Sequence, residues 1–402
     1  MKKVILTGPK TQVRFAGVVS VEVNEDTGVV RPWRIDHQQQ HFFDFGLLFM
    51  AAHCSGCRIR LKTTSDQVHL VVKNLSNTSA CEYDCYANKQ FIGTCVFAGK
   101  NVIDASNIPF NGKEMEMRRM RILDLTIEDK IDDDFHTVKF NVSHIATEPN
   151  EFRNIDIWLP HTSSVQIKDV LIQPNSKVER PLRDLRGKFL THGSSITHGI
   201  AADATTTAKG RGSARSPSKS WPATCSRICD FNLINLGFGG QCHMDNSVAR
   251  MIRDLPADFI CLKLGINVHN LASLGVRGFS QAVMGFLRTI RDGHPDTPIV
   301  VVSPIYSTWR ETLSANVLTL SMTPERDTKL KHILSLEQMR RHLQRVVDIL
   351  RNNGDLNLYY RTGLDLFNAD DFHAGLMPDG LHPNAAGYEM IGRRFAALEF
   401  GT

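Results

Sequence analysis

Apolar residues follow two different patterns along this chain, and the change comes near residue 176. Before it, short segments such as Arg58-Ile59-Arg60-Leu61-Lys62 alternate apolar with polar positions, as strands with one exposed face do. Little helical periodicity lies between these segments. Residues 1–175 are therefore predicted to form an all-β domain, a β-sandwich of the jelly-roll kind. Its strand candidates are 13–23, 58–62, 68–72, 91–97, 137–142, 155–159 and 165–172.

Beyond residue 186, apolar runs alternate with helical patterns. Residues 279–290 keep one helical face apolar, and Gly293 with Pro295 ends that helix. Ser335 and Gln338 predict a capping box that opens a second helix, which runs to about Asn352. Strands that alternate with helices predict a mostly parallel sheet covered on both faces. The strand candidates here are 188–191, 232–236, 259–264 and 299–303.

Length and composition agree with two domains. The chain has 402 residues, of which 42% are hydrophobic, and this length exceeds what one core usually holds. The polar segment from Pro174 to Arg186 contains two prolines and separates the two patterns. We therefore predict a β-domain at 1–175, a linker at 176–186 and an α/β domain at 187–402.

Charge and cysteine usage narrow the function classes. The net charge of +5 comes from scattered residues, so it indicates no nucleic-acid partner. No apolar run has the length of a signal peptide or a membrane span, which predicts a cytoplasmic protein without a membrane partner. The nine cysteines are an odd number and are expected to be reduced core thiols. A zinc site at Cys54, Cys57, Cys81 and Cys85 is the less favoured alternative.

Two short segments far apart in the sequence carry the candidate chemistry. Gly193-Ser194-Ser195-Ile196-Thr197 follows an apolar run, and Asp379-Gly380-Leu381-His382-Pro383 lies near the C-terminus. A serine hydroxyl becomes a nucleophile when a histidine takes its proton, and a carboxylate can hold that histidine in the required tautomer. The sequence thus offers Ser195, His382 and Asp379 as a catalytic triad.

Two further segments lie between them. Asn235-Leu236-Gly237-Phe238-Gly239-Gly240 and Gly265-Ile266-Asn267-Val268 each follow a strand candidate, where α/β sheets place their ligand-binding loops. Taken in order, the four blocks resemble the SGNH hydrolase superfamily, or GDSL esterases, over roughly residues 185–400. The resemblance implies a flavodoxin-like three-layer α/β/α domain.

The resemblance also implies roles for single residues. Ser195 would be the nucleophile, His382 the general base and acid, and Asp379 its orienting partner. The oxyanion hole would consist of the Ser195 and Gly240 backbone N–H groups and the Asn267 side chain. The family usually has Asp where this chain has Ser194, and often Asp where it has Val268. Neither position transfers the proton, so these differences bear on substrate more than on chemistry.

Other polar residues near these blocks are candidates for the pocket wall. His198 and His269 lie beside Ser195 and Asn267, and Trp309 and Arg310 follow the strand candidate that ends near Ser303. We predict these four residues as substrate contacts, with His192 and His243 as further wall candidates. A basic loop with Lys209, Arg211, Arg215 and Lys219 is expected to be solvated. The alternative is a flap over Ser195 that selects anionic or polyol substrates.

These inferences predict a cofactor-independent serine esterase acting on a small-molecule or carbohydrate ester. The preferred substrate is a short acyl group, most simply acetyl, on a sugar or another polyol, because β-domains precede SGNH domains in carbohydrate esterases. A lipid or thioester acylhydrolase is one alternative. The other is a catalytically inactive carbohydrate-binding protein. The β-domain is expected to serve packing or homo-oligomerisation rather than sugar binding.

Overall fold

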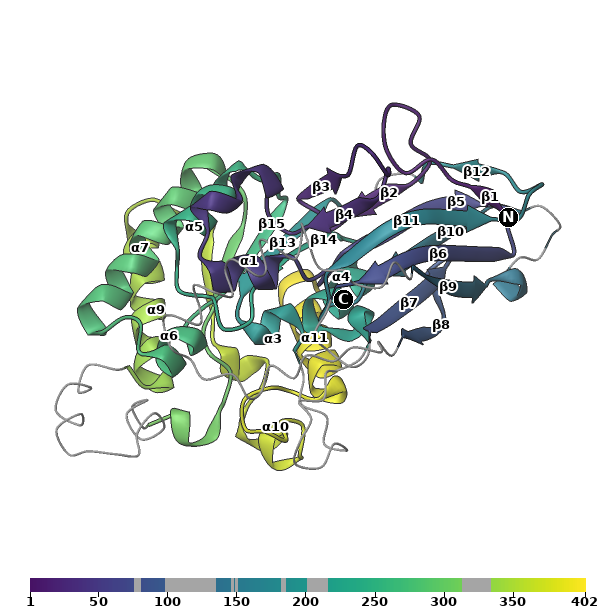
Figure 1. Cartoon of the computed structure of the whole chain (residues 1–402). Helices are drawn as coiled ribbons and strands as arrows, with labels where there is room; N and C mark the ends of the chain where they lie inside the picture. Colours follow the sequence, from purple (N-terminus) through teal and green to yellow (C-terminus); the bar gives the residue numbers. More distant parts are fainter. Residues whose placement is uncertain are drawn as a thin grey trace, which may run out of the picture. The chain divides into compact units, whose positions relative to one another are not determined.

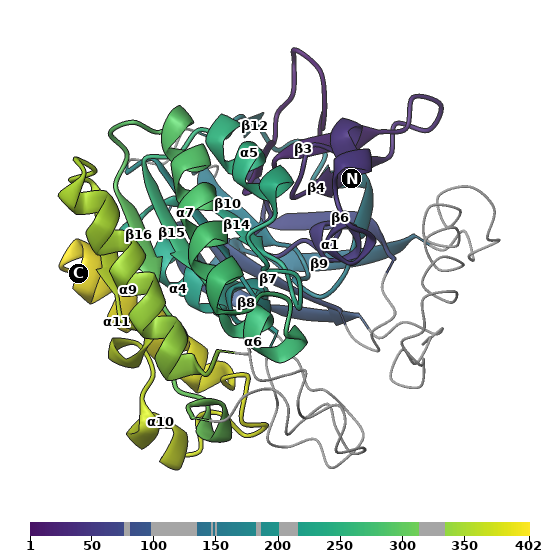
Figure 2. The same cartoon turned by 90° about the vertical axis from the view of Figure 1, so that its left-hand side faces the viewer.

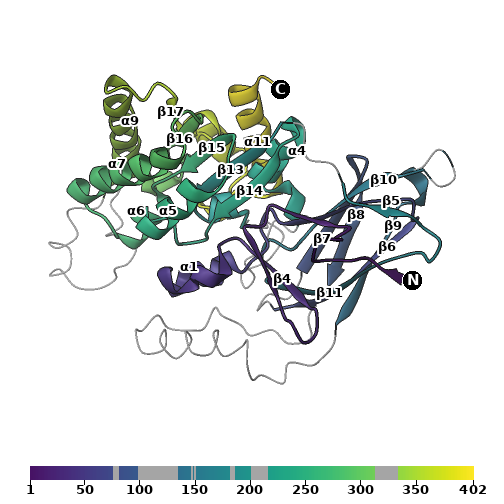
Figure 3. The same cartoon turned by 90° about the horizontal axis from the view of Figure 1, so that it is seen from above.

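The chain forms two compact units in a computed structural model, residues 1–182 and 183–402. The structure describes residues 1–75, 81–97, 135–145, 148, 151–181, 186–200, 216–312 and 334–402. Figures 1 and 3 together label their helices and strands. The predicted basic loop, apart from Lys219, and residues 182–185 of the predicted linker lie outside these ranges. Within them, no helix is both long and apolar enough to cross a membrane.

The N-terminal unit contains two antiparallel sheets. In the first, β1 pairs with β11 beside a path of five strands: β3 (Ser20–Val23), β4 (Val30–Trp33), β11 (Val165–Ile172), β6 (Gln67–Asn74) and β9 (His136–Asn141), with β1 at Lys2–Lys3. In the second, β2 pairs with β5 beside the path β12 (Val178–Glu179), β5 (Arg58–Thr63), β10 (Arg153–Trp158), β7 (Cys81–Ala87) and β8 (Gln90–Phe97), with β2 at Arg14–Ala16.

Both sheets contribute to one apolar core. Ile59 and Leu61 of β5 and Val68 and Leu70 of β6 are fully buried in the same cluster. Their period of two along each strand is the alternation that the sequence analysis used. The thiols of Cys54, Cys57, Cys81 and Cys85 are free and buried, and the described residues contain no group of three or more metal-binding side chains that could hold an ion.

The structure adds detail that the apolar pattern did not predict. The single candidate at 13–23 is two strands in different sheets, because Gly17 adopts a φ of +72° between β2 and β3. A helix, α1 (Phe45–Ala51), begins where Asp44 accepts a hydrogen bond from the Gly46 N–H, and two 3-10 helices, η1 (His37–Phe42) and η3 (Ser143–Ile145), also interrupt the strands. The predicted linker begins inside this unit, since β12 pairs with β5.

The C-terminal unit is built on a parallel sheet of five strands. Their spatial order is β14 (Asn232–Gly237), β13 (Lys188–Gly193), β15 (Phe259–Lys263), β16 (Ile299–Val302) and β17 (Leu358–Arg361). All four strand pairs are parallel, so the carboxyl ends of the strands lie at one edge. This sheet makes the fold a mixed α/β fold, with the α/β pattern confirmed in the C-terminal unit.

Helices cover both faces of this sheet (Figures 2 and 3). On one face, Phe189 of β13 packs against Trp221 of α4 and Phe395 of α11. On the other, His192 packs against Phe286 of α7. The helices are α3 (Ser195–His198), α4 (Trp221–Cys229), α5 (Asn246–Asp254), α6 (Ile266–Leu271), α7 (Val276–Gly293), α9 (Leu336–Asn352), α10 (Ala369–His373) and α11 (Ala385–Phe400), with 3-10 turns η4 (Pro217–Lys219), η5 (Thr308–Arg310) and η7 (Gly363–Asp365).

Close packing at the end of β14 gives a first prediction. A Cβ atom on Gly237 would lie 2.2 Å from the His198 backbone nitrogen and 2.5 Å from the Thr197 carbonyl carbon. Because backbone atoms cannot move aside cheaply, Gly237→Ala should destabilise the chain by about 1–3 kcal/mol.

The matched control is Gly285→Ala inside α7, where nothing lies within 4 Å of the new Cβ. This change should stabilise the helix by about 0.5–1 kcal/mol. Urea unfolding followed by circular dichroism measures both effects. Equal midpoints for the two variants would contradict the packing argument.

Candidate active site

Ser195 lies where β13 turns into α3. It is the first residue of the helix and is 8% exposed. Ser194 caps this helix, because its side chain accepts a hydrogen bond of 3.3 Å from the Ile196 N–H. The serine that stands in place of the usual family Asp therefore still supplies the oxygen that holds this turn.

Gly193 lets the turn come close to the neighbouring strand. A Cβ there would lie 2.3 Å from the Thr197 hydroxyl oxygen and 2.9 Å from the Lys263 carbonyl oxygen. Farther along, Tyr388 of α11 donates its hydroxyl to the Ile200 carbonyl. The residues on both sides of Ser195 are thus fixed by the rest of the unit.

The structure brings His382 and Asp379 to Ser195. The His382 Nε2 atom lies 2.9 Å from Ser195 Oγ, and Nδ1 lies 2.8 Å from Asp379 Oδ2. An ionised carboxylate only accepts hydrogen bonds, so Nδ1 carries the proton and Nε2 is left to accept from the serine hydroxyl. This is the tautomer that a general base needs.

Asp379 also shapes the turn that carries His382. Its Oδ1 atom accepts the backbone N–H groups of Leu381 at 2.9 Å and His382 at 2.6 Å. Gly380 between them has a φ of +72°, which favours glycine. Burial opposes ionisation of Asp379, but the hydrogen bonds from His382 and these two N–H groups outweigh it and lower the pKa of Asp379. The carboxylate therefore stays ionised at pH values below the ordinary pKa of an aspartic acid.

The oxyanion-hole candidates follow the two strands beside β13. Gly193 pairs in register with Gly237 of β14 and with Lys263 of β15. Gly240 comes shortly after β14, and Asn267 lies in the first turn of α6, directly after β15. The segment with Ser195 is therefore flanked on both sides by the segments that carry the other two donors.

Hydrogen bonds to their oxygen atoms fix the positions of the Asn267 side chain and the Gly240 peptide. The Asn267 Oδ1 atom accepts the Cys242 N–H at 3.1 Å, which leaves its NH₂ group to donate elsewhere. The Gly240 carbonyl lies 3.0 Å from His243 Nε2, and His243 Nδ1 lies 2.8 Å from Ser273 Oγ. Within the described part of the chain, no backbone carbonyl accepts a hydrogen bond from the N–H group of Ser195 or Gly240. These groups can donate to a bound substrate oxygen.

The four predicted substrate contacts lie in two settings, two of them buried histidines and two on the loop after β16. His198 and His269 are fully buried, and His269 Nδ1 lies 2.9 Å from the Leu334 carbonyl oxygen. Arg310 stacks over the Trp309 ring at 4.0 Å and hydrogen-bonds to protein groups near His382. The structure therefore buries both histidines and places Arg310 beside the turn of Asp379.

His192 is a buried neutral base beneath the site. Its Nδ1 lies 2.7 Å from the Leu236 carbonyl oxygen, and its Nε2 lies 3.5 Å from the Cys242 sulfur. Burial lowers the pKa of His192 to about 4, although the hydrogen bond to Leu236 acts in the opposite direction. It serves packing and is not a second base for Ser195.

Sequence reasoning missed three polar residues near this edge. Ser307 and Asn270 both bond to Arg310, and nothing in their spacing marks them. Lys263 stands alone in an apolar strand and is 2% exposed, and burial lowers the pKa of Lys263 to about 8. The only sequence signal for these three residues was the position of Lys263, a charged residue within the apolar run 259–264.

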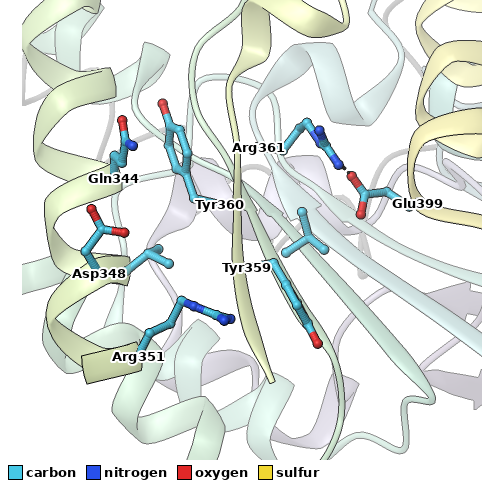
Figure 4. A pocket seen from close by; sticks show the side chains of 9 residues that line it. Gln344, Asp348, Arg351, Tyr359, Tyr360, Arg361 and Glu399 are labelled. Atoms are coloured by element: carbon cyan, nitrogen blue, oxygen red, sulfur yellow. Dashed lines mark hydrogen bonds and ion pairs between the residues drawn. The ribbon is translucent and has the colours of Figure 1, made fainter. Parts of the chain in front are cut away.

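A separate hollow of about 330 Å³ lies over β17, between α9 and α11 (Figure 4). Arg361 in its wall is paired with Glu399 at 2.8 Å, and Arg351 donates to the Leu358 carbonyl. None of the predicted site residues lines it. Arg361 is therefore ion-paired, whereas Arg351 bonds to backbone carbonyls of the strand and its approach.

Comparison with known proteins identifies the C-terminal unit. The family model described as the GDSL-like lipase/acylhydrolase family matches residues 188–397. No curated protein matches the chain in sequence.

Several solved structures are similar over almost the whole chain. The salicylyl-acyltransferase SsfX3 from a tetracycline biosynthetic pathway is 23% identical, with a TM-score of 0.75 over 99% of this chain and 98% of that one. A Bacteroides ovatus protein described as a GDSL-like lipase is 18% identical, with a TM-score of 0.62 over 96% and 94%. A family two carbohydrate esterase from Clostridium thermocellum, in complex with cellohexaose, is 14% identical, with a TM-score of 0.58 over 92% and 98%. At these identities the likeness shows the fold.

The buried histidine gives a prediction about pH. Folded His192 has a pKa of about 4 against 6.5 for the ordinary group, so the unfolded chain binds the extra proton between these values. Its contribution to stability is complete above pH 6.5 and is lost as pH falls toward 4, by up to about 3 kcal/mol. His192→Gln cannot take this proton, so its free energy of unfolding should fall less steeply over this window.

Urea unfolding of both proteins at pH 8, 7, 6, 5 and 4.5 tests this. Between pH 7 and 8 the difference between the proteins should stay constant, because His192 is then neutral in both states. Curves that run parallel down to pH 4.5 would contradict the prediction.

Proposed function

Because the chain belongs to the GDSL-like lipase/acylhydrolase family, we propose that it is a serine esterase in which Ser195, His382 and Asp379 act as a catalytic triad. The carrying observation is the continuous hydrogen-bond path from Ser195 Oγ to His382 Nε2 at 2.9 Å and from His382 Nδ1 to Asp379 at 2.8 Å. Such a path is the geometric signature of an activated serine.

In the proposed reaction, His382 Nε2 takes the Ser195 proton while Oγ attacks the ester carbonyl carbon. The resulting oxyanion accepts from the N–H groups of Ser195 and Gly240 and from the Asn267 amide, each worth about 3 kcal/mol if it resembles other such donors. Collapse breaks the bond to the alcohol, which leaves with the proton from His382. Water then gives its proton to His382 and attacks the acyl-enzyme, releasing the acid and restoring Ser195.

For the substrate, we propose a short acyl ester of a sugar or another polyol. The support is the similarity in length and fold to carbohydrate esterases, one of them a complex with cellohexaose. Two antiparallel sheets that share one apolar core support a jelly-roll sandwich for the N-terminal unit. In this proposal the N-terminal unit serves packing or homo-oligomerisation rather than sugar binding.

A second candidate is transfer of the acyl group to an alcohol acceptor other than water. The observation that favours it is the TM-score of 0.75 to the salicylyl-acyltransferase, with nearly complete coverage of both chains. The first half-reaction is the same. The two candidates differ only in what attacks the acyl-enzyme. Under the transferase alternative, an added polyol should speed release of the substrate's alcohol and form a new ester. Under the esterase proposal it should do neither.

The esterase proposal predicts hydrolysis of p-nitrophenyl esters that is greatest with acetate. Ser195→Ala removes the nucleophile and should lower kcat by at least about 10³-fold. The measurement is a series from acetate to decanoate at neutral and mildly alkaline pH. Activity that rises with acyl length would favour a lipid or thioester acylhydrolase.

A fluorophosphonate probe provides the control for an inactive protein. It should label the native chain and leave Ser195→Ala unlabelled. Folded native protein that neither hydrolyses the esters nor takes the label would contradict the enzyme and favour the binding-protein alternative.

The role of Asp379 can be tested separately. Asp379→Asn should lower kcat by about 10³- to 10⁴-fold, because an amide that donates to His382 favours the wrong tautomer. The circular dichroism spectrum and the urea midpoint check that the turn survives. A loss below about tenfold would indicate that Ser195 and His382 work as a dyad.

A further inference from the structure

The carbonyl oxygen of Gly380 is held by two side chains of one loop. Ser307 Oγ donates to it at 2.7 Å and Arg310 Nη1 at 3.0 Å. A carbonyl oxygen has two lone pairs, and these two donors occupy both. Gly380 is the middle of the turn in which Asp379 orients His382, so the loop after β16 fixes this turn from outside.

Arg310 also reaches the helix that carries Asn267. Its Nε atom donates to Asn270 Oδ1 at 3.0 Å, and Nη1 also contacts Ser307 Oγ at 3.1 Å. Asn270 lies three residues after Asn267 in α6, which is a single helical turn. One guanidinium group therefore spans the turn of the proposed base and the helix of a proposed oxyanion donor.

The loop that presents Arg310 is itself anchored. Glu311 receives two hydrogen bonds from Arg340 of α9, at 2.6 and 2.9 Å, and accepts the Ser307 N–H at 2.9 Å. Arg340 Nε donates further to the Pro304 carbonyl at 2.9 Å. Both charged side chains are largely buried, where a paired charge holds its geometry strongly. The stacking of Arg310 on Trp309 restricts the guanidinium plane as well.

We infer that Arg310 is a positioning residue, which with Ser307 holds the Asp379–His382 turn and α6 at a fixed spacing, so that base and oxyanion donor are set together. The inference rests on the proposed esterase function. It gives Arg310 a role other than the predicted substrate contact, because its Nε and Nη1 donors are directed at protein acceptors. Arg310 acts through Gly380 and Asn270 and touches neither reacting atom.

Arg310→Met tests this inference, since methionine keeps the apolar stem and removes every donor. We expect kcat for p-nitrophenyl acetate to fall by about 10- to 100-fold, the scale of a small misplacement of reacting groups, with KM changed less than about threefold. Arg310→Lys keeps the charge but not the planar fork, so it should recover only part of the loss. A substrate contact would instead raise KM, and full recovery by lysine or an unchanged kcat would overturn the inference.

The matched control is Arg291→Met. Arg291 also bridges two carbonyls and a carboxylate, those of His294, Thr297 and Asp355, but these precede β16 and β17, at the opposite edge of the sheet. Its loss should lower the urea midpoint and leave kcat unchanged. Asn270→Leu combined with Arg310→Met completes a double-mutant cycle, in which the two effects on kcat should be less than additive because they share one hydrogen bond.

A second measurement does not depend on activity. Hydrogen exchange of the peptides covering 379–384 and 266–271 should become faster in Arg310→Met and stay unchanged in Arg291→Met. If the native chain proves inactive, the proposed function fails, and exchange alone decides the inference. Exchange at the native rate in both peptides would overturn it.

Discussion

Everything at the proposed site depends on the close approach of α3 to the ends of β13 and β14. Gly193 and Gly237 have no side chains there, and a single added carbon at either would come within 2.3 Å of an atom of α3. This contact brings Ser195 to the carboxyl edge of the sheet, between the segments that carry Gly240 and Asn267. The register of β13 with β14 and β15 therefore places the backbones of Ser195, Gly240 and Asn267 relative to one another. Electrostatic stabilisation of an oxyanion requires donors that do not reorganise during the reaction.

The apolar pattern predicted those elements whose periodicity is strong. The residues 279–290 lie in α7, and the capping box of Ser335 and Gln338 opens α9 as expected. The strands β4, β7 and β17 were missed, as were the two-residue strands β1 and β12. In β7 every residue of Cys81–Ala87 is buried, so no alternation marks it. The division of 13–23 between two sheets depends on the backbone angle of Gly17, which apolar periodicity does not encode.

The residues of the triad could be proposed from the sequence because their chemistry is unusual and their motifs are local. Asp379 and His382 are three residues apart, so a single local turn brings them together. Arg310 illustrates the opposite case. Two of its acceptors come from distant segments, at Asn270 and Gly380, and the third is Ser307 of its own loop. Only the folded sheet edge shows that these belong together, and the sequence suggested substrate contact instead.

The separation of Ser195 from its base has a consequence for biosynthesis. The nucleophile turn and the strands around it are translated long before Asp379 and His382, which come from the last part of this sequence. A nascent chain can therefore form β13 to β16 while its serine hydroxyl remains an ordinary alcohol. Under the proposed mechanism, the Ser195 hydroxyl gains its base only after translation has passed His382 and the turn with Asp379 has docked on the sheet, so reactivity toward esters would follow the folding of that turn.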